Sequence, residues 1–394
     1  MNYSKAIAQE HPSMHSFYEF FAGGGMVRAG LGAGWDCLFA NDFDRKKGAT
    51  YSKNWGDESL VVADIRNLSS DDFPGSPDLV WGSFPCQDLS LAGAGAGLQG
   101  DRSGTFWPFV SHIRCLKDEG RAPKILALEN VLGTLTSHDG KDFAAICSAL
   151  DELGYAFGAL VADAADFVPQ SRPRLFMFGV LREIANDLPN VSSSPNKHWH
   201  PSRLLRAYYK LPEQLRANWR WFSPPTPGER QMNFVDIVED NPSSTTWHTP
   251  KETTALLSMM SEVNLAKVET AQRAKTRMVG TIYKRTRHEH GIKVQRAEIR
   301  FDEIAGCLRT PAGGSSRQLV MVVDGPRIRS RLISTRETAR LMGLSDNYEL
   351  PERYNEAYHL TGDGVAVPVV RHLSAHLFEP IIEQANAEYL VKQF

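Results

Sequence analysis

His15–Leu31, with the sequence HSFYEFFAGGGMVRAGL, indicates the class of fold. Its first eight residues are rich in aromatic side chains and are typical of a buried strand. Three glycines follow, and Met26–Leu31 then has helical character. Strand, glycine turn and helix make the repeating unit of α/β proteins, in which backbone N–H groups approach a ligand at the start of the helix. Taken alone, such a turn is as often structural as functional, and it lacks the GxGxxG spacing of a dinucleotide-binding turn.

Acidic side chains follow the next two predicted strands. Trp35–Ala40 leads into Asp42 and Phe43, and Leu60–Val62 leads into Asp64. A carboxylate at the end of the second strand is where α/β proteins bind ribose hydroxyls. Asp42 could equally be the N-cap of the next helix. Phe43 could stack on an adenine or belong to the core, and Asp64 could accept a hydrogen bond from an adenine amino group.

The stretch DLVWGSFPCQ, Asp78–Gln87, predicts a fourth strand that Gly82 and Pro85 terminate. Cys86 therefore lies on the loop at the carboxyl end of the strand, which is where chemistry gathers in open α/β sheets. A single cysteine is more often a small buried hydrophobe than a nucleophile. The glycine-rich segment 88–104 comes next, and a loop of this length predicts a functional lid.

A carboxylate and two arginines accompany the later strands. Lys124–Leu128 predicts a fifth strand that Glu129 follows, and on its own such a residue is more often a helix cap than a catalyst. Arg172 and Arg174 alternate at strand spacing between two further apolar strands, 155–162 and 174–180. Arginines on a common face suit phosphate or carboxylate recognition. The alternative is a pair of solvated surface charges.

Composition limits the classes of protein. The chain has 394 residues, of which 42% are hydrophobic and 23% charged, so two globular domains are expected rather than disorder. Its five scattered cysteines have no zinc-binding spacing, and there is no secretory signal or membrane-length apolar run. These features favour a reduced, cytoplasmic protein without a metal. The net charge of -2 hides a basic run at 267–300, which holds ten Lys and Arg against three Glu and suits a nucleic-acid backbone.

The order of these motifs resembles that of the C5-cytosine DNA methyltransferases. The resemblance covers about residues 16–186 and 305–380. It is carried by FAGGG at 21–25, Asn41–Asp42, Asp64–Ile65, FPCQ at 84–87, Glu129–Asn130–Val131, QSRPR at 170–174, LISTRETARLMG at 332–343 with a helix capped near Thr335, and a turn at Gly362 leading into an apolar helix. The segment from about 188 to 305 matches only in position, at the place of the family's variable target-recognition domain.

The resemblance implies a fold and a domain order. It predicts a Rossmann-like sheet of the S-adenosylmethionine-dependent methyltransferases, with helices on both faces and a smaller inserted target-recognition domain. Residues 16–187 would form the first part of the catalytic domain and 188–325 the recognition domain. Residues 326–394 would return to complete the catalytic domain.

S-adenosylmethionine is the cofactor that the resemblance implies. Phe21, Gly23 and Gly25 would wrap its methionine part, and Asp42 would hold its ribose hydroxyls. The other predicted contacts are Phe43, Asp64, Ile65, Phe106 and Asp363. At position 363 the family usually carries Asn, and a carboxylate beside the cofactor's own carboxylate predicts a modest loss of affinity.

The resemblance also implies a mechanism. The Cys86 thiolate would attack C6 of a cytosine flipped out of duplex DNA, and Glu129 would bind and protonate N3. Arg174 would hold the base, supported by Arg172. A helix N-terminus or neighbouring arginines could generate the thiolate. The predicted DNA contacts are Gln87, Lys284, Arg285, Arg287, Arg309, Ser315, Ser316 and Arg317.

The expected partner is duplex DNA, bound by a monomer close to the nucleoid, with a restriction endonuclease as a possible companion and no membrane. Three alternatives remain. The same site could methylate cytosine in RNA, the chain could be a catalytically silent regulator, or the first glycine turn could bind a nicotinamide. The complete set of Cys86, Glu129 and Arg174 argues against the second, and the missing GxGxxG against the third.

Overall fold

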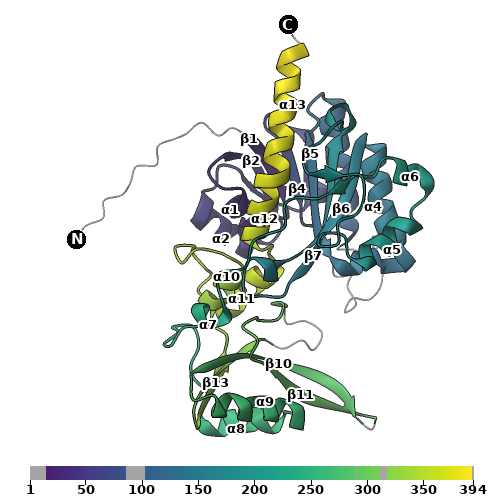
Figure 1. The fold of residues 1–394 in the computed structure, drawn as a ribbon. Helices are drawn as coiled ribbons and strands as arrows, with labels where there is room; N and C mark the ends of the chain where they lie inside the picture. Colours follow the sequence, from purple (N-terminus) through teal and green to yellow (C-terminus); the bar gives the residue numbers. More distant parts are fainter. Residues whose placement is uncertain (1–14, 86–102, 290, 311–316, 393–394) are drawn as a thin grey trace.

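The computed structural model describes residues 15–85, 103–289, 291–310 and 317–392 (Figure 1). Its main feature is a seven-stranded sheet in the order β3-β2-β1-β4-β5-β7-β6, in which β7 runs antiparallel to both of its neighbours. The strands are β1 (His15–Phe20), β2 (Trp35–Asp42), β3 (Leu60–Val62), β4 (Leu79–Gly82), β5 (Ile125–Val131), β6 (Tyr155–Asp163) and β7 (Pro173–Leu181). The predicted α/β class is confirmed.

Helices cover both faces of this sheet because its strands alternate in side-chain direction. Phe17 and Trp81 belong to the core with α1 (Met26–Leu31), α2 (Arg45–Trp55), α12 (Val367–Leu373) and α13 (Glu379–Lys392). Tyr18 and Val80 belong to the core with α3 (Phe106–Asp118) and α4 (Lys141–Glu152). Figure 1 shows α12 and α13 lying against the strands at the start of the chain. The C-terminal segment therefore completes the large sheet domain.

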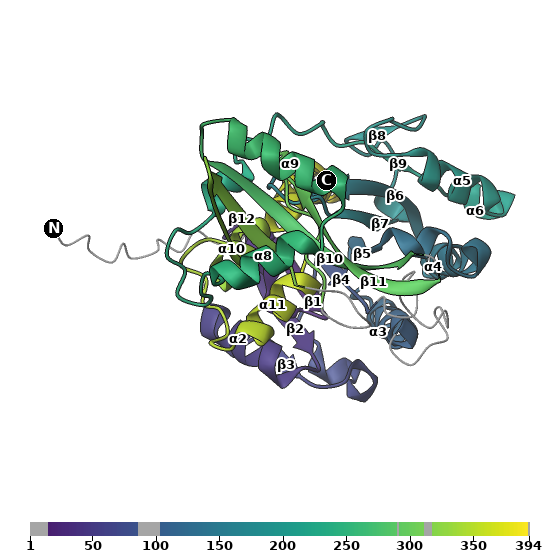
Figure 2. The ribbon, with the colours of Figure 1, turned by 90° about the horizontal axis from the view of Figure 1, so that it is seen from below.

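A second, antiparallel sheet has the order β11-β10-β12-β13. Its strands are β10 (Met278–Glu289), β11 (Ile292–Arg300), β12 (Leu319–Asp324) and β13 (Arg327–Leu332). One face packs on α8 (Pro250–Ser258) and α9 (Glu262–Arg273) through residues such as Met321 (Figure 2). On the other face, Val320 and Val322 join the core of the large domain.

The segment between the two sheets does not divide at the expected boundaries. α5 (Ser202–Lys210), α6 (Glu213–Ala217), β8 (Val191–Ser192) and β9 (Trp221–Phe222) all follow residue 188. Leu204 and Trp219 nevertheless share a core with Phe157 of the large sheet. At the other end, β13 lies beyond residue 325 yet pairs with β12 in the small sheet. The second packing unit thus runs from about His248 to Leu332.

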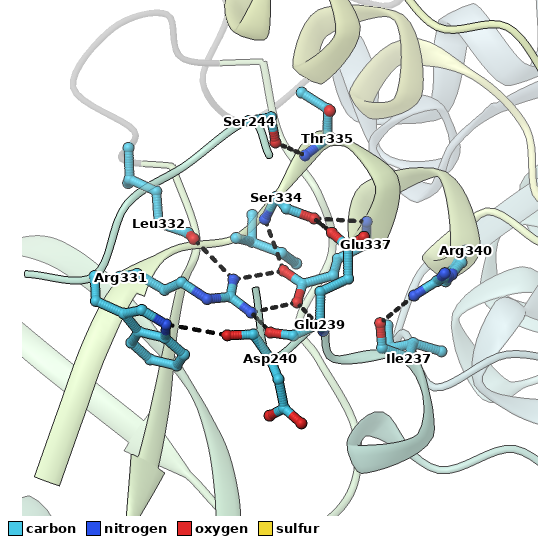
Figure 3. Close-up of polar contacts among 12 residues, drawn as sticks. Ile237, Glu239, Asp240, Ser244, Arg331, Leu332, Ser334, Thr335, Glu337 and Arg340 are labelled. Atoms are coloured by element: carbon cyan, nitrogen blue, oxygen red, sulfur yellow. Dashed lines mark hydrogen bonds and ion pairs between the residues drawn. The ribbon is translucent and has the colours of Figure 1, made fainter. Parts of the chain in front are cut away.

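A buried ion pair joins the small sheet to the large domain (Figure 3). Arg331 on β13 and Glu337 on α10 (Thr335–Leu341) are both fully buried and form a bidentate pair. Glu337 also accepts hydrogen bonds from the backbone N–H groups of Ser334 and Glu239, both at 2.7 Å. Ser334, and not the expected Thr335, is the N-cap of α10. α7 (Phe234–Ile237) and the loop after it lie far in the sequence from β13 and α10, which follow each other closely.

The apolar helix that the sequence predicts after the Gly362 turn is divided into pieces. Gly362 and Asp363 lie in the last turn of α11 (Tyr354–Asp363), and Gly364 ends that helix. α12 follows, and a π-helical turn at Ser374–Phe378 separates it from α13. The turn near Gly362 is therefore a helix end, held by contacts described below.

Candidate active site

Glu129 and Arg174 face each other across two adjacent strands. Val131 on β5 and Arg174 on β7 are partners in the antiparallel ladder, which brings the two side chains together. Arg174 Nε lies 3.1 Å from Glu129 Oε1, and both side chains are mostly buried. Because β5 continues to Val131, Glu129 lies inside a strand and is not a helix cap. A buried carboxyl group held by a guanidinium can bind the ring nitrogen of a base and exchange a proton with it.

Asn130 connects this pair to the loop after β4. Its Nδ2 donates to the carbonyl oxygen of Phe84 at 3.3 Å, and its Oδ1 accepts from Val131 N at 2.8 Å. The Phe84 ring in turn packs on Phe106 at a tilt of 44°, with ring centroids 5.1 Å apart. The backbone two residues before the predicted nucleophile is thereby fixed beside Glu129. Cys86, Gln87 and most of the predicted lid lie outside the described residues.

Arg172 is buried and binds backbone carbonyls rather than facing solvent. Its guanidinium donates to the carbonyl oxygens of Leu308, Gly362 and Gly364, at 3.1, 2.9 and 2.7 Å. The alternative of a solvated surface charge is therefore wrong. These bonds fix the end of α11 and the segment 305–310 relative to β7. Arg172 acts on the site through this positioning, while Arg174 contacts Glu129 directly.

The segment 305–310 packs against the arginines, although no sequence signal places it there. The buried Gln170 side chain donates to Leu341 O at 2.7 Å and accepts from Leu308 N at 3.0 Å. Cys307 Sγ lies 3.4 Å from Arg172 Nη1 and 3.8 Å from Arg174 Nη2. Burial raises the pKa of the Cys307 thiol, but the two guanidinium groups outweigh burial and the net direction is down.

The predicted cofactor residues gather where β1, β2 and β3 end. Asp42 is buried, and its carboxylate accepts from Gly23 N and Asp44 N, both at 2.8 Å. Asp44, not Asp42, caps α2, so the helix-cap alternative for Asp42 is wrong. Phe21, Gly23 and Gly25 all have left-handed backbone, with φ of 59°, 58° and 76°. This backbone turns the chain sharply around the space beside Asp42.

Phe43 exposes 68% of its surface next to the buried Asp42 carboxylate. A large exposed aromatic beside a buried polar group is typical of a binding site for a flat ligand. Ile65 and Phe106 are buried in the core, and Asp64 accepts from Arg66 N at 2.9 Å. Contacts from these three residues to a cofactor stay predictions.

Asp363 lies against Lys47 and Thr310. Lys47 Nζ is 2.9 Å from Asp363 Oδ2, and the Thr310 hydroxyl donates to the other carboxylate oxygen. Burial lowers the pKa of Lys47, and Asp363 and Asp42 raise it by more. Lys47 thus neutralises the negative charge by which Asp363 differs from the usual Asn. The expected loss of cofactor affinity is therefore smaller. Neither Lys47 nor Thr310 is among the predicted site residues.

Glu19 is another residue that the motifs missed. It lies on β1 beneath the glycine turn and is 1% exposed. Burial raises its pKa to about 8, against the opposing effect of the Val27 and Arg28 backbone N–H groups. Its place two residues before Phe21, in the strand that enters the turn, was the available signal.

The predicted DNA contacts lie on and around the small sheet. Lys284, Arg285 and Arg287 are on β10, and Arg309 is exposed on the segment 305–310. Arg317 donates to Asn355 and lies 5.8 Å from the centre of the Tyr354 ring. Ser315 and Ser316 lie outside the described residues. In the part of the chain that the structure describes, there is no cluster of three or more metal-ligating side chains. Across the same residues, each helix is too short or too polar to span a bilayer.

Comparisons with known proteins agree with this geometry. Residues 15–379 match the family model of the C-5 cytosine-specific DNA methylases. The chain is 24% identical to the type II methyltransferase M.HhaI of Haemophilus parahaemolyticus, over 92% of this chain and 93% of that protein. It is 27% identical to M.PspPI of a Psychrobacter species, over 98% and 83%.

Solved structures share the fold. The Dnmt2 methyltransferase of S. pombe has a TM-score of 0.56 at 18% identity, covering 93% of this chain and 99% of that one. A DNA modification methyltransferase encoded within an E. coli prophage has a TM-score of 0.55 at 16% identity, covering 94% and 99%. With the family model matching almost the whole chain, the protein belongs to the C-5 cytosine-specific DNA methylases.

Proposed function

We propose that this enzyme transfers a methyl group from S-adenosylmethionine to C5 of a cytosine that is flipped out of duplex DNA, through a covalent bond between Cys86 and C6. The observation that carries the proposal is the buried Glu129–Arg174 pair, which Asn130 ties to the backbone leading into Cys86. A carboxyl group paired with an arginine, next to the backbone that leads into a cysteine, provides groups that the reaction needs.

The chemistry starts from a carbon that is a poor nucleophile. The Cys86 thiolate adds to C6, the S–C6 bond forms, and the electron pair of the 5,6 double bond becomes available at C5. Glu129 hydrogen-bonds to N3 and delivers a proton there, while Arg174 holds Glu129 and the base. C5 takes the methyl group and a base removes its proton. Elimination of Cys86 then restores the double bond and the free thiolate.

The cofactor residues fit S-adenosylmethionine. When bound, it supplies an electrophilic methyl group. The exposed Phe43 ring offers a stacking surface for adenine, and the buried Asp42 carboxylate beside it can accept from ribose hydroxyls. The left-handed turn at Phe21, Gly23 and Gly25 bends the chain around the place of the methionine part, and no atom lies within 4 Å of a Cβ built on Gly23. We also infer that the unit from about His248 to Leu332 is the recognition domain.

A mechanism-based trap tests the covalent step. Duplex DNA that contains 5-fluorocytosine, incubated with enzyme and cofactor, should give a protein–DNA adduct that survives denaturing electrophoresis, because fluorine at C5 cannot leave as a proton does. Cys86→Ser should give no adduct. The proposal fails if Cys86→Ser forms the adduct, or if the parent enzyme methylates DNA without forming any.

Bisulfite sequencing of DNA from cells that express the protein should reveal the methylated sequence. Methyl incorporation into duplex DNA, compared with incorporation into tRNA, separates DNA from RNA as the substrate. The monomeric state, the place beside the nucleoid and the companion endonuclease stay predictions.

A further inference from the structure

The β10–β11 hairpin has two faces with different surroundings. Along β10, Val279 belongs to the core of the large domain and Tyr283 donates to Cys307 O at 2.6 Å, whereas Ile282 packs with α8 and α9. Side chains alternate along a strand. Arg285 and Arg287 therefore continue the face directed toward the large domain, and Lys284 continues the opposite face. Figure 1 shows the hairpin extending beyond α9 on the side of the large domain.

The face toward the large domain carries arginines that are held by carboxylates. Arg285 Nε lies 3.4 Å from Glu298 Oε2, and Arg287 Nε donates to Glu298 Oε1 at 2.8 Å. Arg296, the cross-strand partner of Arg285, donates to Glu289 at 2.7 Å. One glutamate thus orients two guanidinium groups that stand two residues apart. The Arg285 guanidinium also lies 5.9 Å from the centre of the Tyr283 ring.

The opposite face has a different composition. By the register of the hairpin, Lys284, Thr286 and His288 lie across from Ala297, Gln295 and Lys293. None of these six residues is acidic. The basic run of the sequence is therefore divided between one face on which glutamates hold the arginines and an opposite face whose six paired residues include no acidic side chain.

The side chains of Arg285 and Arg287 are about half exposed, at 52% and 50%, and the Glu298 side chain that holds them is 29% exposed. Ion pairs at such exposure contribute little to stability. They are strong enough to restrict the rotamers of the arginines and weak enough to exchange for a nucleic-acid contact. Arginine in a fixed orientation can bind a guanine edge or a phosphate with two parallel hydrogen bonds.

We propose that the face of the hairpin directed toward the large domain contacts the duplex through Arg285, Arg287 and Arg296, and that Glu298 and Glu289 position these arginines. The inference rests on the proposed function, because a duplex that delivers a cytosine to Glu129 lies between this face and the large domain. Glu298 reduces the positive charge with which this face attracts DNA of any sequence. It also keeps the guanidinium groups oriented toward the target sequence. The opposite face, Lys284 included, is not in contact.

Binding measurements with charge-matched variants test the choice of face. The probes are a duplex that carries the sequence found by bisulfite mapping and the same duplex with that sequence scrambled. Arg287→Gln should weaken binding to the target duplex about tenfold or more, as expected for the loss of one guanidinium contact of about 1–3 kcal/mol. Lys293→Gln, on the next rung but the other face, should change the Kd less than twofold. Equal losses for the two variants would overturn the proposal.

Glu298→Gln tests the positioning role by a readout that a merely structural residue would not move. The substitution should tighten binding to the scrambled duplex several-fold at low salt, because removing the carboxylate leaves this face with one more net positive charge. The affinity should also fall more steeply with salt concentration. Binding to the target should not tighten equally, so discrimination falls. Unchanged discrimination would overturn the role of Glu298. If the parent enzyme methylates DNA and the hairpin variants behave like it, only this inference fails; a parent that methylates no DNA refutes the proposed function instead.

Discussion

At the scale of single residues, Lys47 decides what the carboxylate of Asp363 does. The family resemblance puts Asp363 beside the carboxylate of the bound cofactor, and Lys47 neutralises it at 2.9 Å. Lys47→Met should weaken binding of S-adenosylmethionine several-fold, a loss of about 1 kcal/mol for a half-exposed pair. Adding Asp363→Asn should restore the affinity to within twofold of the parent, because the repulsion is then removed. Isothermal titration calorimetry with the cofactor alone gives both values.

Lys46→Met provides the control for this cycle. Lys46 precedes Lys47 on α2 and pairs with Glu356 on α11 at 2.9 Å, with 68% of its side chain exposed. Its loss should leave the cofactor Kd unchanged. A double variant that binds as weakly as Lys47→Met alone would contradict the neutralising role of Lys47.

Glu19 makes stability depend on pH. Burial raises its folded-state pKa to about 8, above the value of 4.5 for an exposed glutamate. The folded state therefore holds a proton that the unfolded state releases, so stability is lost as pH rises from about 4.5 to 8. Glu19→Gln should raise the free energy of unfolding by roughly 4 kcal/mol more at pH 8.5 than at pH 5. Urea unfolding at both pH values measures this, with the exposed Glu58→Gln as the reference; equal gains at both pH values would refute it.

Residue identities in motifs were predictable, and their long-range partners were not. The pairing of Glu129 with Arg174 follows from two motifs at the ends of neighbouring strands. By contrast, Cys307 and Lys47 meet their partners across 133 to 316 residues of sequence. No local pattern encodes such contacts, because they depend on how whole elements are placed. The hydrogen bonds from Arg172 to buried carbonyl oxygens are also contacts between residues that are distant in the sequence.

At the scale of elements, the start of α10 depends on a buried charge. Glu337 caps the helix through Ser334 and neutralises Arg331, and all three are fully buried (Figure 3). Glu337→Gln should lower the free energy of unfolding by about 3–5 kcal/mol, because Arg331 keeps its charge without a counter-ion. Arg331→Met together with Glu337→Met should recover a large part of that loss. Urea unfolding measures all three proteins.

Asp346→Asn is the matched control. Asp346 follows α10 and pairs at 2.8 Å with Arg340 of that helix, but 61% of the Asp346 side chain is exposed. Its loss should change the free energy of unfolding by less than about 1 kcal/mol. A comparable loss from Asp346→Asn and Glu337→Gln would show that burial of the pair is not what stabilises the junction.

The strands of the large sheet were easier to predict than the short elements that pack around it. β1 to β7 are runs of apolar residues bounded by glycine, proline or acidic residues, so each was visible in the sequence and only its ends moved. α5, α6 and β9 fall in the predicted recognition domain because the family's motifs stop near residue 188. They pack instead on Phe143 and Phe157 of the large domain, mainly through Trp219. Aromatic residues in a polar, proline-rich segment do not reveal which surface they cover.

At the scale of the whole molecule, the order of strands could not be derived from apolar runs; only the family resemblance implied it. Seven strands of similar composition can pair in many ways, and β7 enters the sheet between β5 and β6 as a long-range antiparallel insertion. The packing of the C-terminal segment on the first strands likewise could not be derived from apolar runs. It joins α1 to α12 so closely that a Cβ on Gly30 would lie 2.8 Å from the carbonyl oxygen of Val367.

This return makes the last helix part of the catalytic core. Leu377, Phe378, Ile381 and Ile382 are each at most 2% exposed, and Phe378 packs edge-to-face on Trp81 of β4. Burial of four such side chains contributes roughly 6–12 kcal/mol, which is comparable to the whole stability of a domain. A chain that ends at Leu373 should therefore be unfolded by circular dichroism. A chain that ends at Asn386 should melt as the full chain does, because the residues it lacks include Tyr389 and Val391, which are 65% and 75% exposed. A folded protein ending at Leu373 would mean that the large sheet is stable without its C-terminal cover.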